Sequence, residues 1–418
     1  MWPGLVHGAP VNHFAQLLLG QLAAVALCAT FAMFANSCAD DDRGTPSSTS
    51  AAGVAATGVP ETSSTSTSVP PATATRVPGA EWISVSPDDV DLDPSVLGEV
   101  AETASAGNSR CLVVARDGVL AGEWYFEGST AESTQNVFSV TKSVTSVLVG
   151  IAQADGVLDI EQSASTWIPE WKGTPSEAVT VRDLLSNDSG REWSVAIDYG
   201  QLLRSKDTTG FAIGLGQAAA PGEVWAYNNS AIQTLERVLE SATGVDVATF
   251  AEERLFGPLG MTQTRMATDA AGNTQVFQGV KSTCRDLARF GTMLLNRGAW
   301  GDRQVVPAAW IDQATGRSSS SLNAAYGYLF WLNRPGTIAS PLVAAGVGQP
   351  AEAATDGQVA AGAPDDIFWA IGFGNQIVQV DPGSRTVVVR LGAAVRPEPP
   401  TFGPVEASRV VTDAVTGS

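Results

Sequence analysis

Histidine is almost absent from this chain, and its absence excludes several kinds of catalytic and metal site. The sequence has 418 residues and two histidines, His7 and His13, so residues 14–418 contain none. That part of the chain therefore cannot form a Ser-His-Asp triad, a Cys-His pair or a histidine-ligated metal site. We expect a protein that needs neither a metal ion nor another cofactor.

Basic side chains are scarce as well. Lys and Arg number 24 against 43 Asp and Glu, which gives a formal net charge of −19. Nucleic-acid binding is excluded as a function, because phosphate neutralisation needs clustered basic residues. The apolar content of 44% is typical of a globular protein and argues against wholesale disorder.

One long apolar run lies near the N-terminus. Residues 14–35 carry no charge and are long enough to span a bilayer. Ser37 then precedes Cys38 and an acidic stretch, an order that resembles a bacterial lipoprotein processing site with Cys38 lipidated. Lys and Arg are missing before the run, where a signal peptide normally has them, so an uncleaved anchor is the alternative. Both interpretations place the rest of the chain outside the cytoplasm and attached to the membrane.

The composition predicts three segments. Residues 1–38 form the signal or anchor segment. Residues 39–80 are rich in Ser, Thr and Pro and bury too little apolar surface to fold, so we expect a disordered tether. Residues 81–418 form the folded domain. Two cysteines remain there, Cys111 and Cys284, and the sequence leaves open whether they form a disulfide or stay as buried thiols.

The pattern of the folded part predicts an α/β (α+β) domain. Two strands flank the Asp117-Gly118 turn, and two more flank residues 381–384 near the other end. The middle is mostly helical, with apolar residues three or four positions apart around residues 144–151, 232–239 and 287–294. We therefore expect a central antiparallel sheet built from both chain ends, with a helical insertion beside it.

Without histidine, a lysine is an alternative base for a serine nucleophile. Ser139 and Lys142 lie at positions i and i+3 at the start of a predicted helix, so their side chains are neighbours. Burial lowers the pKa of a lysine, which then accepts the serine proton. A helix-capping Ser139 with a Lys142 that reaches solvent is the structural alternative.

Two later segments add polar groups. Tyr227 and Asn229 form a Tyr-x-Asn loop before a predicted helix, and residues 370–376 form a Gly-rich entry to a strand. The structural alternatives are a core aromatic for Tyr227, an N-cap for Asn229 and a strand bulge for the glycines.

Taken together and in this order, these residues resemble the serine hydrolases of the class C β-lactamase and penicillin-binding-protein family. The likeness also rests on residues 179–190, 256–261 and 285–291 and covers nearly the whole folded domain. It implies a β-lactamase/transpeptidase-like fold. It also implies that Ser139 is the acylated nucleophile, that Lys142 and Tyr227 transfer its proton, and that Asn229 orients the lysine or the substrate.

The resemblance further implies an oxyanion hole made by the backbone N–H groups of Ser139 and Phe373, the residue after Gly372. The family's strand motif is usually Lys-Thr-Gly or His-x-Gly, whereas here it is Ala370-Ile371-Gly372. This departure and the run that follows it look most like the family's esterases and nylon-oligomer (6-aminohexanoate-oligomer) hydrolases.

We therefore expect an exported serine hydrolase that cleaves a small-molecule ester or amide. The rivals are a β-lactamase or D,D-peptidase on the same scaffold, and a penicillin-binding-like sensor without turnover. Residues 334–366, rich in Gly, Ala and Pro, form either a loop at the mouth of the active site or a disordered insertion.

Overall fold

A computed structural model describes residues 76–350, 354–395 and 399–416. The apolar run, Cys38 and all but the last residues of the expected tether lie outside this part of the chain. Within the described ranges, no helix is both long enough and apolar enough to cross a membrane.

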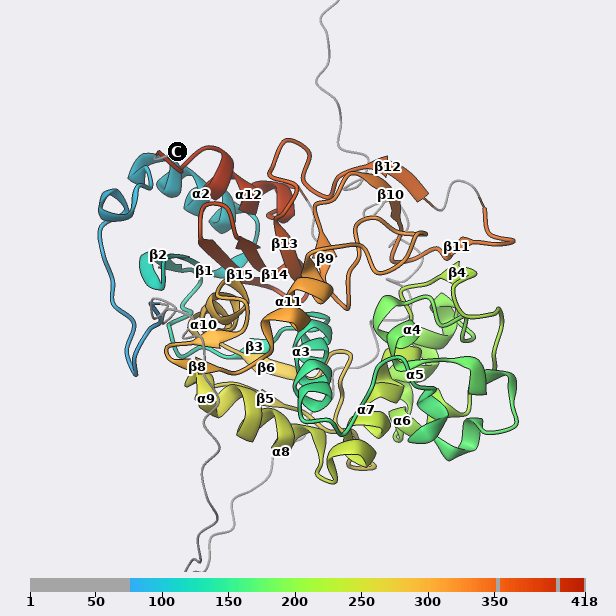
Figure 1. The fold of residues 1–418 in the computed structure, drawn as a ribbon. Helices are drawn as coiled ribbons and strands as arrows, with labels where there is room; N and C mark the ends of the chain where they lie inside the picture. Colours follow the sequence, from blue (N-terminus) through green and yellow to red (C-terminus); the bar gives the residue numbers. More distant parts are fainter. Residues whose placement is uncertain (1–75, 351–353, 396–398, 417–418) are drawn as a thin grey trace, which may run out of the picture.

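The central sheet is antiparallel and is built from both ends of the domain, as predicted (Figure 1). The Asp117-Gly118 turn has positive φ at both residues, the backbone that a tight hairpin requires. The strand order is β2-β1-β15-β14-β13-β9. The strands are β1 (Ser109–Arg116), β2 (Val119–Tyr125), β9 (Trp331–Leu332), β13 (Phe368–Gly372), β14 (Gln376–Asp381) and β15 (Thr386–Gly392).

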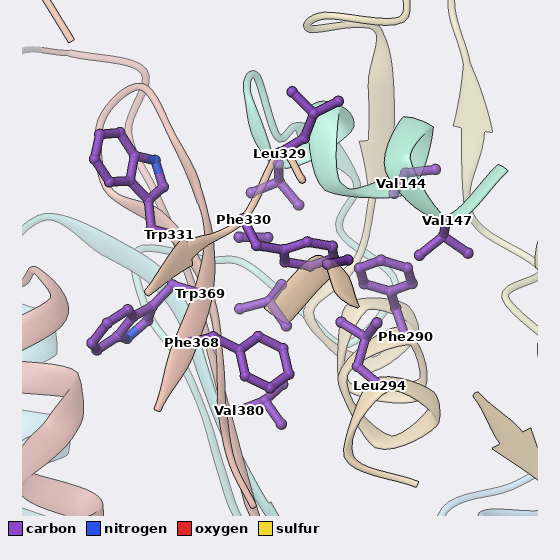
Figure 2. Close-up of a cluster of buried hydrophobic side chains, with 14 of the residues drawn as sticks. Val144, Val147, Phe290, Leu294, Leu329, Phe330, Trp331, Phe368, Trp369 and Val380 are labelled. Atoms are coloured by element: carbon purple, nitrogen blue, oxygen red, sulfur yellow. The ribbon is translucent and has the colours of Figure 1, made fainter. Parts of the chain in front are cut away.

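Helices cover both faces of this sheet (Figure 1). The helices α2 (Pro94–Ala106) and α12 (Pro404–Thr412) pack on one face, and α3 (Val140–Ala154) and α10 (Cys284–Leu295) pack on the other. Figure 2 shows the apolar core between α3, α10 and strands β9, β13 and β14, where Phe290, Phe330 and Phe368 meet. Burial of such side chains is the main driving force for this layering.

The remaining helices form the insertion beside the sheet and its connections. The helix α7 (Asn229–Thr243) begins after the N-cap Asn228 and is ended by the C-cap Gly244, which has φ +76°. The other α-helices are α4 (Val181–Ser186), α5 (Leu202–Arg204), α6 (Thr208–Ile213), α8 (Val247–Ala251), α9 (Gly257–Leu259) and α11 (Ala308–Thr315). The 3-10 and π segments are Pro87–Val90, Ala164–Thr166, Pro169–Trp171, Pro175–Ala178, Ile197–Gln201 and Glu252–Phe256.

The segment 334–366, expected as a loop at the mouth of the active site or a disordered insertion, contains short strands in its described residues. One of its strands, β11 (Ala345–Gly346), pairs with β4 (Val224–Trp225), which ends two residues before Tyr227, so the segment reaches the Tyr-x-Asn loop. The short strands are β3 (Gln135–Asn136), β4 (Val224–Trp225), β5 (Arg265–Met266), β6 (Val280–Ser282), β7 (Ala299–Trp300), β8 (Arg303–Gln304), β10 (Gly336–Ala339), β11 (Ala345–Gly346) and β12 (Ala354–Gly357).

Cys111 and Cys284 form a disulfide. Cys111 lies in β1 and Cys284 is the first residue of α10, so the bond ties the sheet to the helix that covers it. Of the two alternatives that the sequence left open, a disulfide or two buried thiols, the structure contains the disulfide.

Candidate active site

The Ser-x-x-Lys motif lies at the start of α3. Ser139 directly precedes the first helical residue and is partly exposed, whereas Lys142 is buried, with 1% of its surface exposed. The Lys142 Nζ donates a hydrogen bond to Ser139 Oγ at 2.8 Å. The Ser139 side chain makes no capping bond to the helix, so the capping alternative is wrong.

Lys142 is held in an apolar and aromatic environment. Its Nζ also donates to the backbone oxygen of Phe277 at 2.9 Å and lies 4.8 Å from the centre of the Tyr227 ring. Burial disfavours the charged ammonium and lowers the pKa of Lys142 to about 7, while the carboxylate of Asp198 acts in the opposite direction. A substantial fraction of Lys142 is therefore neutral near neutral pH and able to accept a proton.

Tyr227 lies in a cluster of aromatic side chains. Its ring stacks on Trp331 at 5.9 Å between centroids and meets Tyr326 edge to face at 6.0 Å. Burial raises the pKa of Tyr227 well above its ordinary value, and a hydrogen bond with the Ser139 side chain opposes this shift. The tyrosine is thus both a core aromatic and a neighbour of Ser139, with a hydroxyl that stays protonated at neutral pH.

Asn229 is the first residue of α7 and is buried. The structural alternative that it caps the helix is wrong, because the side chain of Asn228 accepts the capping bond from the Ala231 amide. Instead, the side chain of Asn229 shares a hydrogen bond with the Tyr199 hydroxyl, and its backbone N–H donates to Asp198 Oδ2 at 2.5 Å.

Sequence reasoning missed Asp198 and Tyr199. Both lie in the π-helical turn Ile197–Gln201, between the predicted motifs. Such turns often mark functional sites. The residues of this turn follow no apolar periodicity. The one sequence feature that could have pointed to a site here was the pair Asp198-Tyr199 itself.

The strand β13 approaches the Ser139 segment closely at Gly372. A Cβ at Gly372 would lie 2.2 Å from the Val137 oxygen and 3.2 Å from the Ser139 nitrogen, so the approach admits glycine alone. Phe373 follows; it is 44% exposed, and its ring meets Phe138 edge to face at 5.6 Å. The two segments that carry the predicted oxyanion amides therefore lie side by side.

Buried polar side chains fix the turn after Phe373. Gln376 Nε2 donates to the Phe373 oxygen at 3.0 Å. The guanidinium of Arg390, 2% exposed, donates to the oxygens of Gly374 at 2.5 Å and Asn375 at 2.9 Å. These contacts restrain the backbone of the turn, and an oxyanion hole requires N–H donors that are held in place.

The arrangement supports proton transfer from a serine to a buried amine. Ser139, Lys142, Tyr227 and Asn229 come together from α3 and from the start of α7, while Gly372 and Phe373 come from β13 and the turn after it. Within the described ranges, no group of three or more His, Cys, Asp or Glu side chains is placed to hold a metal ion.

Comparisons with known proteins show what the chain as a whole resembles. The family model described as Beta-lactamase matches residues 100–404. The chain is 30% identical to penicillin-binding protein 4* of Bacillus subtilis over 31% of this chain and 29% of that protein. It is 24% identical to the 6-aminohexanoate-dimer hydrolase of Paenarthrobacter ureafaciens over 48% of this chain and 55% of that protein. The matches thus span between 29% and 55% of these relatives' length.

A similar fold occurs in a solved structure from Bacillus anthracis, provisionally assigned as a 6-aminohexanoate-dimer hydrolase. The two chains share 21% identity, with 82% of this chain and 87% of the other covered and a TM-score of 0.61. At this identity the similarity concerns the fold alone.

Proposed function

The chain belongs to the Beta-lactamase family, a family of serine hydrolases, and we propose that it cleaves an ester or amide through an acyl-enzyme on Ser139. One observation carries the proposal: a buried lysine with its pKa lowered to about 7 donates a hydrogen bond to a partly exposed serine at 2.8 Å. Nucleophile and base within hydrogen-bond reach are what covalent catalysis requires.

In the proposed mechanism, neutral Lys142 accepts the proton of Ser139 as Oγ attacks the substrate carbonyl carbon. The negative oxygen that forms accepts hydrogen bonds from the N–H groups of Ser139 and Phe373. The bond to the leaving group then breaks, and the leaving group takes the proton of the Tyr227 hydroxyl. Lys142 gives Tyr227 a new proton, the one that it had accepted from Ser139. Because burial raises the pKa of Tyr227, its hydroxyl is protonated at neutral pH. Tyr227 is therefore better suited to donate a proton to the leaving group than to accept the proton of Ser139. A water molecule then attacks the acyl carbon and releases the acyl group from Ser139. The proton of the water moves through the same groups in the reverse direction and returns to Ser139 Oγ.

We propose that the substrate is uncharged near the scissile bond. In β13, neither Ala370 nor Ile371 carries a side chain that forms hydrogen bonds, and the residue after the strand, Phe373, exposes an apolar ring that contacts Phe138. A carboxylate that loses one charge-assisted contact binds about 1.5–3 kcal/mol more weakly, or roughly ten- to a hundred-fold. The net charge of −19 adds a weaker penalty for anions, which salt screens.

The test is a panel of p-nitrophenyl esters, linear amides, a cephalosporin and a D-Ala-D-Ala peptide. We expect kcat/KM for the best uncharged ester or amide to exceed that for the cephalosporin by at least about tenfold. The Ser139→Ala protein is the control that assigns the hydrolysis to this site. A cephalosporin or peptide hydrolysed as efficiently as the best ester would favour the β-lactamase or D,D-peptidase alternative. A burst without turnover would favour the sensor.

We also propose that the protein is exported and attached to the membrane through Cys38. The support is the sequence alone: a charge-free run of residues 14–35, then Ser37-Cys38 and acidic residues. In a bacterial host, Cys38→Ser should abolish incorporation of a labelled fatty acid and leave a larger precursor. Cys28→Ser is the matched control in the same segment. Unchanged labelling and mobility in Cys38→Ser would favour the uncleaved anchor.

A further inference from the structure

Asp198 is a buried carboxylate next to the candidate site. None of its surface is exposed, and burial raises its pKa to about 6. Its hydrogen bonds come from the N–H of Asn229 at 2.5 Å, the N–H of Ser230 at 3.3 Å and the hydroxyl of Ser230 at 2.6 Å. The polar groups that begin α7 thus supply hydrogen bonds to a carboxylate that is shielded from bulk solvent.

These donors lie at the N-terminus of a 15-residue helix, where backbone N–H groups lack helical partners and the helix dipole favours negative charge. Tyr227 lies two residues before Asn229 on the same stretch of chain. The carboxylate therefore joins the π-helical turn Ile197–Gln201 to the loop that carries two of the predicted site residues. Tyr199 of the same turn holds the Asn229 side chain, so both ends of this asparagine are fixed from one segment.

Asp198 also acts on Lys142. Within the described part of the chain, it is the one charged group with a resolved effect on that lysine, and it favours the ammonium form. The other groups around Lys142 are the Ser139 hydroxyl, the Phe277 oxygen and the ring of Tyr227. Around Asp198, the other titratable group is the Tyr199 hydroxyl, which stays protonated because burial raises its pKa.

We propose that Asp198 is a positioning residue that fixes Tyr227 and Asn229 beside Ser139, and that its negative charge determines how much of Lys142 is free to act as the base. The catalytic consequence rests on the proposed function, whereas the electrostatic coupling between the two side chains does not. Asp198 keeps part of Lys142 protonated in the resting site, which holds the ammonium in its hydrogen bond to Ser139 Oγ.

The test is Asp198→Asn, which removes the charge and keeps the shape. Lys142 should then lose its proton more readily, so its pKa should fall by about one unit, as expected for the loss of a nearby opposite charge. The chain has four lysines, so ¹³C labelling at the lysine Cε gives few NMR signals, and Lys142→Arg assigns that of Lys142. The acid limb of kcat/KM should move to lower pH by the same amount, with kcat reduced because Tyr227 and Asn229 are less firmly held.

Glu236→Gln is the matched control. Glu236, in α7, is another buried carboxylate, and it accepts a hydrogen bond from Thr209. Burial raises its pKa to about 7, but it has no resolved effect on Lys142. The Lys142 signal and the acid limb should stay in place in this variant. If Asp198→Asn lowers kcat but leaves the pKa of Lys142 and the acid limb of kcat/KM unchanged, the proposed charge effect is wrong.

The wild-type protein gives a second test that needs no folded variant. Two interacting groups with neighbouring pKa values titrate as a pair, so the Lys142 signal should show two inflections, the lower one from Asp198. A single inflection would overturn the coupling even if the enzyme proves inactive on every substrate. If the coupling holds and no substrate is turned over, the proposed function fails and the electrostatic inference stands.

Discussion

Replacing Ser139 with alanine is expected to abolish covalent labelling by a fluorophosphonate and to lower kcat by at least about 10⁴-fold, the scale of nucleophile removal in other serine hydrolases. Ser139 is the only serine with a lysine three residues later in the sequence, and it accepts a hydrogen bond from that lysine. Without its Oγ, no bond to the substrate acyl group can form. Labelling by an activity probe, followed by peptide mass spectrometry, measures the effect directly.

Ser146→Ala is the matched control. Ser146 lies in the same helix, is fully buried and has a hydroxyl without a hydrogen-bond partner in the described part of the chain. Its loss should leave labelling and kcat close to those of the wild type. Persistent labelling of Ser139→Ala at another residue would refute the assignment of the nucleophile.

Replacing Lys142 with arginine should lower kcat by at least about 10²–10⁴-fold, the usual contribution of a general base, and nearly as much as replacing it with alanine. Arginine keeps the positive charge but does not deprotonate in proteins, so it cannot accept the proton of Ser139. In the wild type, kcat/KM should rise with pH through about 7, because the neutral lysine is the active form and its pKa is about 7.

Lys172→Arg provides the control for this substitution, because Lys172 is exposed and takes no part in the candidate site. It should keep the wild-type rate and the wild-type pH profile. Near-normal acylation by Lys142→Arg would mean that the lysine acts through its charge, and the role of base would then pass to Tyr227.

The local elements of this protein could be predicted from its sequence. The Asp117-Gly118 hairpin follows from a turn pair that tolerates positive φ, and Gly244 ends α7 for the same reason. The contact between Ser139 and Lys142 follows from helical geometry, because residues three apart lie on one face. The sheet built from both chain ends is confirmed, since two hairpins whose strands are largely apolar have few other ways to bury their side chains.

Contacts between distant parts of the chain were decided by the tertiary structure alone. The disulfide between Cys111 and Cys284 spans 173 residues, and no local pattern encodes that pairing. Asp198 meets the start of α7 from a π-helical turn some 30 positions away, and its burial and its effect on the charge of Lys142 exist only in the folded chain. The sequence by itself therefore predicted Ser139, Lys142 and Tyr227 as the residues of the proposed chemistry, but not Asp198. Packing determined their protonation, because a pKa depends on the desolvation and the neighbouring charges that folding creates.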